Sequence, residues 1–167
     1  GVQTCALPIL ELAPTTLQEL WRFDANPSGY RHREGKLIDY WKLVRAGKEE
    51  FRADGRLISP SEIIGTPVFN GNYLYVTIGQ DPLHGRGLGA LSCIDPSGHG
   101  DITNRGMVWQ YKEIGRSMST VSVAGDLVYA AETSGKIHCL DARTGELQWV
   151  HDTKEEIWSS TFVADGK

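Results

Sequence analysis

An internal repeat constrains this chain more than any other feature of its sequence. The segment TPVFNGNYLYV, residues 66–76, aligns without a gap on TVSVAGDLVYA, residues 120–130, and conserves the Thr, Gly and Tyr positions of the pattern. Other positions recur after 40 residues instead of 54, as Trp109 does at Trp149. Insertions of 8 and 6 residues in the first copy account for the difference between the two offsets. The chain is therefore expected to repeat one small structural unit.

Each unit is predicted to contain four short strands. In the compact second copy they fall near residues 120–123 and in LVYAAE, IHCLD and ELQWVHD, with the turns AGD, TSGK and ARTG between them. The strand segments are rich in β-branched and aromatic residues, and Gly, Asp and Ser bound them. Four strands per roughly 40 residues, repeated radially, are typical of a propeller blade. We expect an all-β fold, a partial β-propeller of four-stranded antiparallel blades.

The predicted boundaries give about two full blades plus flanking strands. The last strand of one blade falls at residues 17–24, full blades at 65–112 and 118–152, and the start of another after that. Residues 17–167 form the expected propeller part, with an insertion at 25–64. Residues 1–16 show no strand or helix period, and we interpret them as a non-native or disordered segment. The chain as a whole is interpreted as a fragment.

The stretch LDARTGELQW explains how neighbouring blades are expected to meet. Asp141 can accept hydrogen bonds from the turn that it starts, which includes Thr144, and Gly145 can take the positive φ that the turn needs. Trp149 then falls on the outer strand, where a large ring can be buried against the next blade. The equivalent residues of the earlier copies are Asp95, Trp109 and Trp21.

These residues carry a family resemblance. CLDARTGELQW is similar to the Ala-x-Asp-x-x-Thr-Gly-x-x-x-Trp motif of the PQQ-like repeat family, with Cys139 in place of the Ala. The copy ending at Trp109 lacks the Thr-Gly and has DPSGHGD instead. The family includes BamB-like assembly proteins and quinoprotein dehydrogenases. The resemblance implies a propeller that is periplasmic or otherwise exported, and its remaining blades would be partners of those in this chain.

Two insertions are expected to converge on one face, because loops between second and third strands share a face with loops between blades. The first is the Gly-rich QDPLHGRG, where Asp81, His84 and Arg86 form a candidate rim loop able to bind a metal, a cofactor or an anion. The alternative, which we favour, is a structural loop whose Asp-Pro fixes a turn. No third metal ligand is apparent. Glu132 can face the same rim, but no partner for it is evident from the sequence.

The second insertion, residues 25–64, contains YRHREGK and LIDYWKLVRAGKEEF. Apolar residues from Leu37 to Val44 have a loosely helical spacing that Gly47 interrupts. One interpretation is a docking helix with Arg31, Arg33 and Lys36 as a basic patch. The interpretation we favour is an insertion packed on its own blade, its charges solvated.

Composition excludes two classes of partner. A formal net charge of -4 gives no general attraction to nucleic acid, so none is expected as a partner. No apolar run approaches the roughly 18 residues of a membrane span. Cys93 and Cys139 occupy equivalent strand positions and are expected to be small core residues.

For function, the repeat is clear while no catalytic constellation is visible. The favoured hypothesis is a non-catalytic scaffold or binding module that takes a protein partner or a small ligand on the loop-rich face. No cofactor is assigned under this hypothesis. The alternative is a piece of a quinoprotein dehydrogenase dependent on PQQ and calcium, in which an Asp would be the general base. No residue of this chain is assigned to that chemistry.

Overall fold

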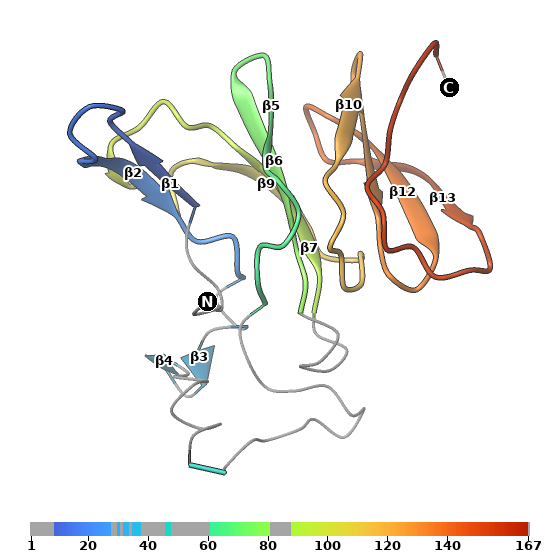
Figure 1. Cartoon of the computed structure of the whole chain (residues 1–167), viewed down its shortest axis with the longest axis horizontal. Coiled ribbons are helices and arrows are strands. Elements are labelled where there is room, and N and C mark those ends of the chain that lie inside the picture. Colours follow the sequence, from blue (N-terminus) through green and yellow to red (C-terminus); the bar gives the residue numbers. More distant parts are fainter. Residues whose placement is uncertain are drawn as a thin grey trace.

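The computed structural model describes residues 9–27, 30, 32–33, 35–37, 46–47, 61–80 and 88–166. Its strands form two four-stranded sheets, one three-stranded sheet and one two-stranded sheet (Figure 1). The two four-stranded sheets lie next to each other, and the three-stranded sheet flanks the first of them. This arrangement confirms the all-β, partial-propeller fold that the repeat predicts.

The first complete blade consists of β5 (Val68–Asn70), β6 (Tyr73–Ile78), β7 (Ala90–Ile94) and β9 (Met107–Tyr111). The strands are antiparallel and lie in the order β5-β6-β7-β9. All four fall inside the predicted unit 65–112.

The second complete blade repeats this plan with β10 (Ser122–Ala124), β11 (Leu127–Ala131), β12 (Lys136–Asp141) and β13 (Leu147–Asp152). The register is the same in both blades. In the first, Tyr75 lies opposite Cys93 and Cys93 opposite Trp109; in the second, Tyr129, Cys139 and Trp149 form the matching row. Both third strands also have an irregularity directly after the cysteine. The aligned sequence copies are therefore structural equivalents, and both cysteines are buried and free.

The flanking sheet joins β1 (Ile9–Leu12) antiparallel to β2 (Glu19–Phe23), and β2 parallel to β8 (Gly100–Asp101). Strand β2 is the predicted last strand of a preceding blade. Strand β1 differs from the sequence interpretation, because it lies within residues 1–16 and pairs with β2. Four residues are too few to show a period, so no pattern in the sequence predicts this strand. The domain boundaries themselves stay a prediction, and residues 1–8 lie outside the described residues.

Little of the predicted insertion at 25–64 is described. Its backbone forms the two-residue strands β3 (His32–Arg33) and β4 (Lys36–Leu37), which pair with each other. Leu37, the first residue of the loosely helical pattern, therefore lies in a strand. The rest of that apolar pattern, residues 38–44, lies outside the described residues, as does Arg31.

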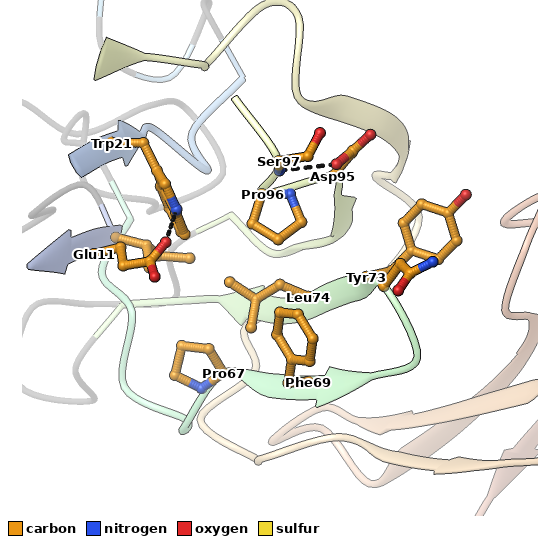
Figure 2. A pocket seen from close by; sticks show the side chains of 11 residues that line it. Glu11, Trp21, Pro67, Phe69, Tyr73, Leu74, Asp95, Pro96 and Ser97 are labelled. Atoms are coloured by element: carbon orange, nitrogen blue, oxygen red, sulfur yellow. Dashed lines mark hydrogen bonds between the residues drawn. The ribbon is translucent and has the colours of Figure 1, made fainter. Parts of the chain in front are cut away.

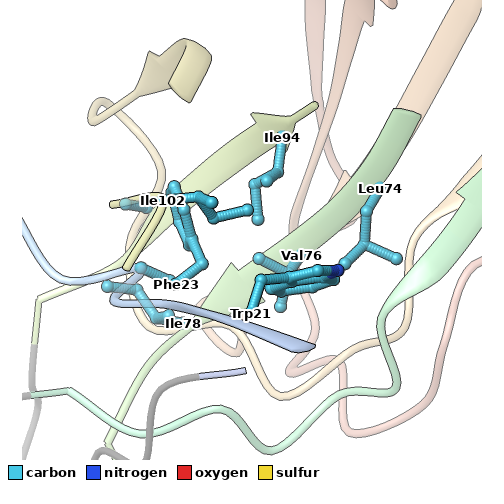
Figure 3. Packing of buried hydrophobic residues seen from close by; sticks show 9 residues of the cluster. Trp21, Phe23, Leu74, Val76, Ile78, Ile94 and Ile102 are labelled. Atoms are coloured by element: carbon cyan, nitrogen blue, oxygen red, sulfur yellow. The ribbon is translucent and has the colours of Figure 1, made fainter. Parts of the chain in front are cut away.

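The core has two layers because the first blade is covered on both faces. Along β6, Leu74, Val76 and Ile78 pack toward β2, together with Trp21, Phe23, Ala25, Ala90, Ile94 and Ile102 (Figure 3). Tyr75 points the other way, into a cluster with Leu91, Cys93, Ile114, Val121, Val128, Ala130, Leu140 and Ala142. This period of two is what a strand buried on both faces shows. Each fully buried large apolar side chain stabilises the fold by about 1.5–3 kcal/mol.

Candidate functional site

The turn between β12 and β13 is held by the side chain of Asp141. Its Oδ1 accepts hydrogen bonds from the backbone N–H groups of Arg143 (2.9 Å) and Thr144 (2.8 Å) and from the Thr144 hydroxyl (3.1 Å). The bond from the Thr144 backbone is the main reason why the pKa of this carboxyl lies below its usual value. Gly145 has a φ of 73°, a conformation that glycine adopts without steric cost.

Trp109 of the first blade packs on this turn of the second blade. Its Nε1 donates a hydrogen bond to the Ala142 carbonyl at 3.0 Å, and the Tyr75 hydroxyl donates to the same oxygen at 3.0 Å. A Cβ atom at Gly145 would lie 2.6 Å from Cδ2 of the indole, so only glycine fits under the ring. The structure thus brings Trp109, Asp141, Thr144 and Gly145 together into one contact between blades.

Trp149 repeats the arrangement of Trp109 within its own blade but is 45% exposed. Its ring lies 6.0 Å from that of Tyr129 at 50°, nearly the geometry of Tyr75 and Trp109, which are 6.1 Å apart at 54°. The expected burial of Trp149 against a following blade stays a prediction.

Trp21 and Asp95 are arranged differently from their counterparts. Trp21 is 5% exposed, and its Nε1 donates to the Glu11 carboxylate on β1. Asp95 accepts a hydrogen bond from the Ser97 N–H at 2.9 Å, which lowers its pKa. A cleft of about 770 Å³ separates the two residues (Figure 2). Its walls also include Phe69 and Leu74.

Strand β8 connects the flanking sheet to the first complete blade. Between the described residues of these two sheets there is no contact like that of Trp109 with Gly145. The Ile102 N–H donates to the Arg22 carbonyl at 2.9 Å, and the Asp24 N–H donates to the Thr103 hydroxyl at 3.1 Å. The side chains of Arg22 and Asp101 form an exposed ion pair at 3.3 Å. The segment of this copy that has no Thr-Gly pattern, which is six residues longer than its counterpart, therefore supplies a different connection between the two sheets.

A second set of contacts links successive copies of the repeat through the hydroxyl groups of Thr120 and Ser160. The Thr66 N–H donates to the Thr120 hydroxyl at 2.9 Å, and the Thr120 N–H donates to the Ser160 hydroxyl at 3.0 Å. These steps of 54 and 40 residues equal the two offsets of the repeat. The recurrence of Thr66 at Thr120 was the signal for this contact in the sequence, although its role was not recognised there.

The described ends of the two insertions meet on one face, as the topology predicts. Asn26 and Ser61 exchange two hydrogen bonds, at 2.8 and 3.0 Å, and so join the ends of the longer insertion. The Ser61 hydroxyl donates to the Leu88 carbonyl, and the Tyr30 hydroxyl donates to the Gly89 carbonyl at 3.3 Å. Figure 1 shows β3 and β4 at the end of the molecule opposite the β5–β6 hairpin. We call this end the loop-rich face.

Asp81, His84 and Arg86, the candidate rim loop, lie outside the described residues. Within the described part of the chain, no group of three or more His, Cys, Asp or Glu side chains is placed to hold a metal ion. In the same part of the chain, no helix has the length and apolar character needed to cross a membrane.

The loop-rich face also contains a cavity of about 270 Å³ next to the buried Glu132. Glu132 accepts hydrogen bonds from the Gly115 N–H and the Ser134 hydroxyl, and its Oε2 lies 3.4 Å from Nε2 of His138. Nδ1 of His138 lies 3.1 Å from the hydroxyl of Tyr111. The sequence did not reveal this polar cluster, because Tyr111 and Gly115 lie far along the chain from the hairpin that carries Glu132, Ser134 and His138.

Comparison with protein families identifies the class to which this fold belongs. A family model described as "Outer membrane protein assembly factor BamB" matches residues 29–151 and 100–167. The chain belongs to this family, which has PQQ-like β-propeller repeats. A comparison with curated protein sequences finds no significant match.

Solved structures with similar folds include BamB from Moraxella catarrhalis, with 19% identity and a TM-score of 0.44 over 63% of this chain and 27% of that chain. A europium-containing methanol dehydrogenase has 18% identity and a TM-score of 0.45 over 63% and 20%. The quinohemoprotein alcohol dehydrogenase ADHIIG from Pseudomonas putida HK5 has 18% identity and a TM-score of 0.47 over 64% and 16%. The matched region is thus about a quarter or less of each of these proteins.

Proposed function

We propose that this chain is part of a non-catalytic propeller that acts as an exported scaffold and binds a protein partner or a small ligand on its loop-rich face. The observation that carries the proposal is the meeting of the two insertions. Hydrogen bonds made by Asn26, Ser61 and Tyr30 tie their ends together. Three residues at these ends also line the cavity: Tyr30, Leu88 and Gly89. Long loops held on a rigid scaffold are where propellers and similar folds carry binding residues.

Family membership supports the same proposal. The family is described as an outer membrane protein assembly factor, and such a description implies protein partners and an exported, periplasmic location. The residues between blades have a structural role in this proposal: Trp21, Trp109 and Trp149 are wedges, and Asp95, Asp141, Thr144 and Gly145 form the turns that receive them. Asp81, His84 and Arg86 would contribute to the rim of the binding face.

The test is site-specific photo-crosslinking in the envelope of the producing cell. A photoreactive residue at Glu113 would lie on the loop-rich face, and one at Asn72, in the β5–β6 hairpin, on the opposite face. We expect a discrete cross-linked product from position 113 and none from position 72. Equal products from both positions, or none from either, contradict the proposal.

The alternative, a piece of a dehydrogenase dependent on PQQ and calcium, is tested separately. Reconstitution of the intact protein with PQQ and calcium, followed by an assay of dye-linked alcohol oxidation, distinguishes the two. Cofactor uptake with turnover contradicts the scaffold proposal, and under that proposal neither is expected.

A further inference from the structure

The cavity on the loop-rich face has a buried carboxylate in its wall. Glu132 directly follows β11 and is 5% exposed. Its Oε2 accepts the Gly115 N–H and faces His138, while Oε1 accepts the Ser134 hydroxyl. A carboxylate offers about four acceptor positions, so one remains after these three partners.

This carboxylate is ionised at physiological pH. Burial raises its pKa, but the neighbouring His138 and the hydrogen bonds from Ser134 and Gly115 outweigh that effect and bring the pKa down to about 2. A Cβ atom at Gly115 would lie 2.8 Å from Oε2, so the absence of a side chain there allows the backbone N–H to approach. The local sequence thus holds a negative charge at a fixed, buried position beside open space.

The wall of the cavity is mostly polar and leaves room for a basic side chain. Tyr30, Leu88 and Ile114 contribute aromatic and aliphatic surface, and the ring of Tyr30 can attract a cation. The cavity has a volume of about 270 Å³. A lysine side chain has five heavy atoms, and if each takes the roughly 30 Å³ that a water molecule occupies, the side chain needs roughly 150 Å³. A lysine side chain therefore fits. An arginine side chain, with seven heavy atoms, also fits by this measure.

The charges at the rim do not reverse this preference. Lys112, Glu113 and Lys136 line the cavity and are exposed, so their charges are solvated and their long side chains can move. An anion in the cavity would lie against the buried charge of Glu132, which cannot move away. The lysines therefore weaken binding of a cation without making the cavity an anion site.

We propose that this cavity receives the ammonium or guanidinium group of a basic side chain that a protein partner presents to the loop-rich face. The inference rests on the proposed function and adds the chemistry of recognition: Glu132 and the cavity select a Lys or Arg of the partner. A charge-assisted hydrogen bond to Glu132 supplies the specificity.

The direct test uses n-butylammonium as the probe, with butyrate and 1-butanol as charge controls. Backbone amide shifts of Gly115 and Ser134 in the chain are followed by NMR. We expect saturable shifts with n-butylammonium at a Kd on the order of millimolar and none with either control. Preference for butyrate, equal response to 1-butanol, or no saturation contradicts the inference.

Three variants sharpen the test. Glu132→Gln should weaken binding of n-butylammonium by about tenfold or more, because it removes the charged acceptor. Lys136→Met should strengthen binding about two- to fivefold, because it removes a like charge from the rim without touching Glu132. Glu146→Gln, an exposed carboxylate in the turn between β12 and β13, is the matched control and should change nothing. If Glu132→Gln does not fold, Lys136→Met alone tests the inference, because it should strengthen binding of n-butylammonium. Weaker or unchanged binding by Lys136→Met contradicts the inference.

A competition experiment separates this inference from the proposed function. Saturating n-butylammonium should suppress the cross-link formed from position 113. If the cross-link persists undiminished, the partner does not use the cavity, and the inference fails while the proposed function stands. If n-butylammonium binds but no cross-link forms at either face, the cavity takes free amines only, and both the proposed function and the partner assignment fail.

Discussion

At the scale of single residues, the contact between Trp109 and Gly145 accounts for how two blades meet. The indole covers a turn whose backbone is held by Asp141, and two side chains of the first blade donate to one carbonyl of the second. The contact needs a hydrogen-bond donor on the ring and no side chain beneath it. Both requirements are open to substitution.

Replacing Gly145 with Ala tests whether the contact with Trp109 requires a residue without a side chain. The φ of 73° costs a non-glycine residue about 1–2 kcal/mol, and overpacking against Trp109 adds about 1–3 kcal/mol. The control is Gly125→Ala in the β10–β11 turn, where φ is 59° and a Cβ meets nothing within 4 Å. Urea unfolding should show the larger loss for Gly145→Ala. Equal losses would mean that the ring does not cover this glycine.

Replacing Trp109 with Phe tests the donor. The ring remains, but the bond from Nε1 to the Ala142 carbonyl is lost, at about 1 kcal/mol in the free energy of unfolding. Trp149→Phe is the matched control, since Trp149 is 45% exposed in an equivalent position. We expect that control to change stability by less than about 0.5 kcal/mol. A control loss as large as that of Trp109→Phe would contradict the assignment.

Glu132 should make the stability of the fold depend on pH. Its pKa is about 2 in the folded state against 4.5 for an ordinary glutamate, so the folded state is favoured when the group is ionised. This contribution is complete above about pH 4.5 and is lost as the pH falls toward 2. Between these values the unfolding free energy should fall more steeply for the wild-type chain than for Glu132→Gln. Parallel pH profiles would show that Glu132 is not stabilised by its partners.

At the scale of elements, β8 replaces a contact that its copy of the repeat has lost. The segment after β7 carries DPSGHGD instead of the Thr-Gly turn, and its backbone pairs in parallel with β2. Ile102, directly after β8, is fully buried among Trp21 and Phe23. The link between these two sheets therefore depends on a strand and one apolar anchor.

Truncating the anchor should loosen this link. Ile102→Ala removes buried methyl groups and should lower the free energy of unfolding by about 2–5 kcal/mol. Val108→Ala on β9, where the side chain is 42% exposed, is the control and should cost less than about 1 kcal/mol. Thermal unfolding monitored by circular dichroism measures both. A loss for Ile102→Ala no larger than that of the control would contradict the account.

Strands that recur were predictable, whereas strands that occur once were not. The four strands of each full blade were predicted from the alternation of apolar and polar residues and from the turn residues between strands. The same pattern in the second copy supported the prediction. Strand β8 has two residues and β1 has four, so neither shows a period, and the pairing of β8 depends on Arg22 and Ile102, about 80 positions apart. Such long-range pairing leaves no local signal in a single sequence.

At the scale of the whole molecule, the topology predicted which face the two insertions share but not the residues of the proposed binding site. Alternating strand directions place both insertions on one face, and the bonds from Asn26 and Tyr30 show that their described ends meet there. Glu132 was recognised only as a turn residue facing that side. Its contacts with Gly115, and through His138 with Tyr111, depend on how one blade packs on the next.

The central claim is that neighbouring four-stranded blades are held together by an indole lying over a glycine turn. NMR of the α protons of Gly145 tests it most directly. With the ring of Trp109 over this residue, those protons should be shifted upfield and show cross-relaxation to the indole protons, and Trp109→Leu should abolish both effects. Unshifted α protons without cross-relaxation to Trp109 would contradict the account.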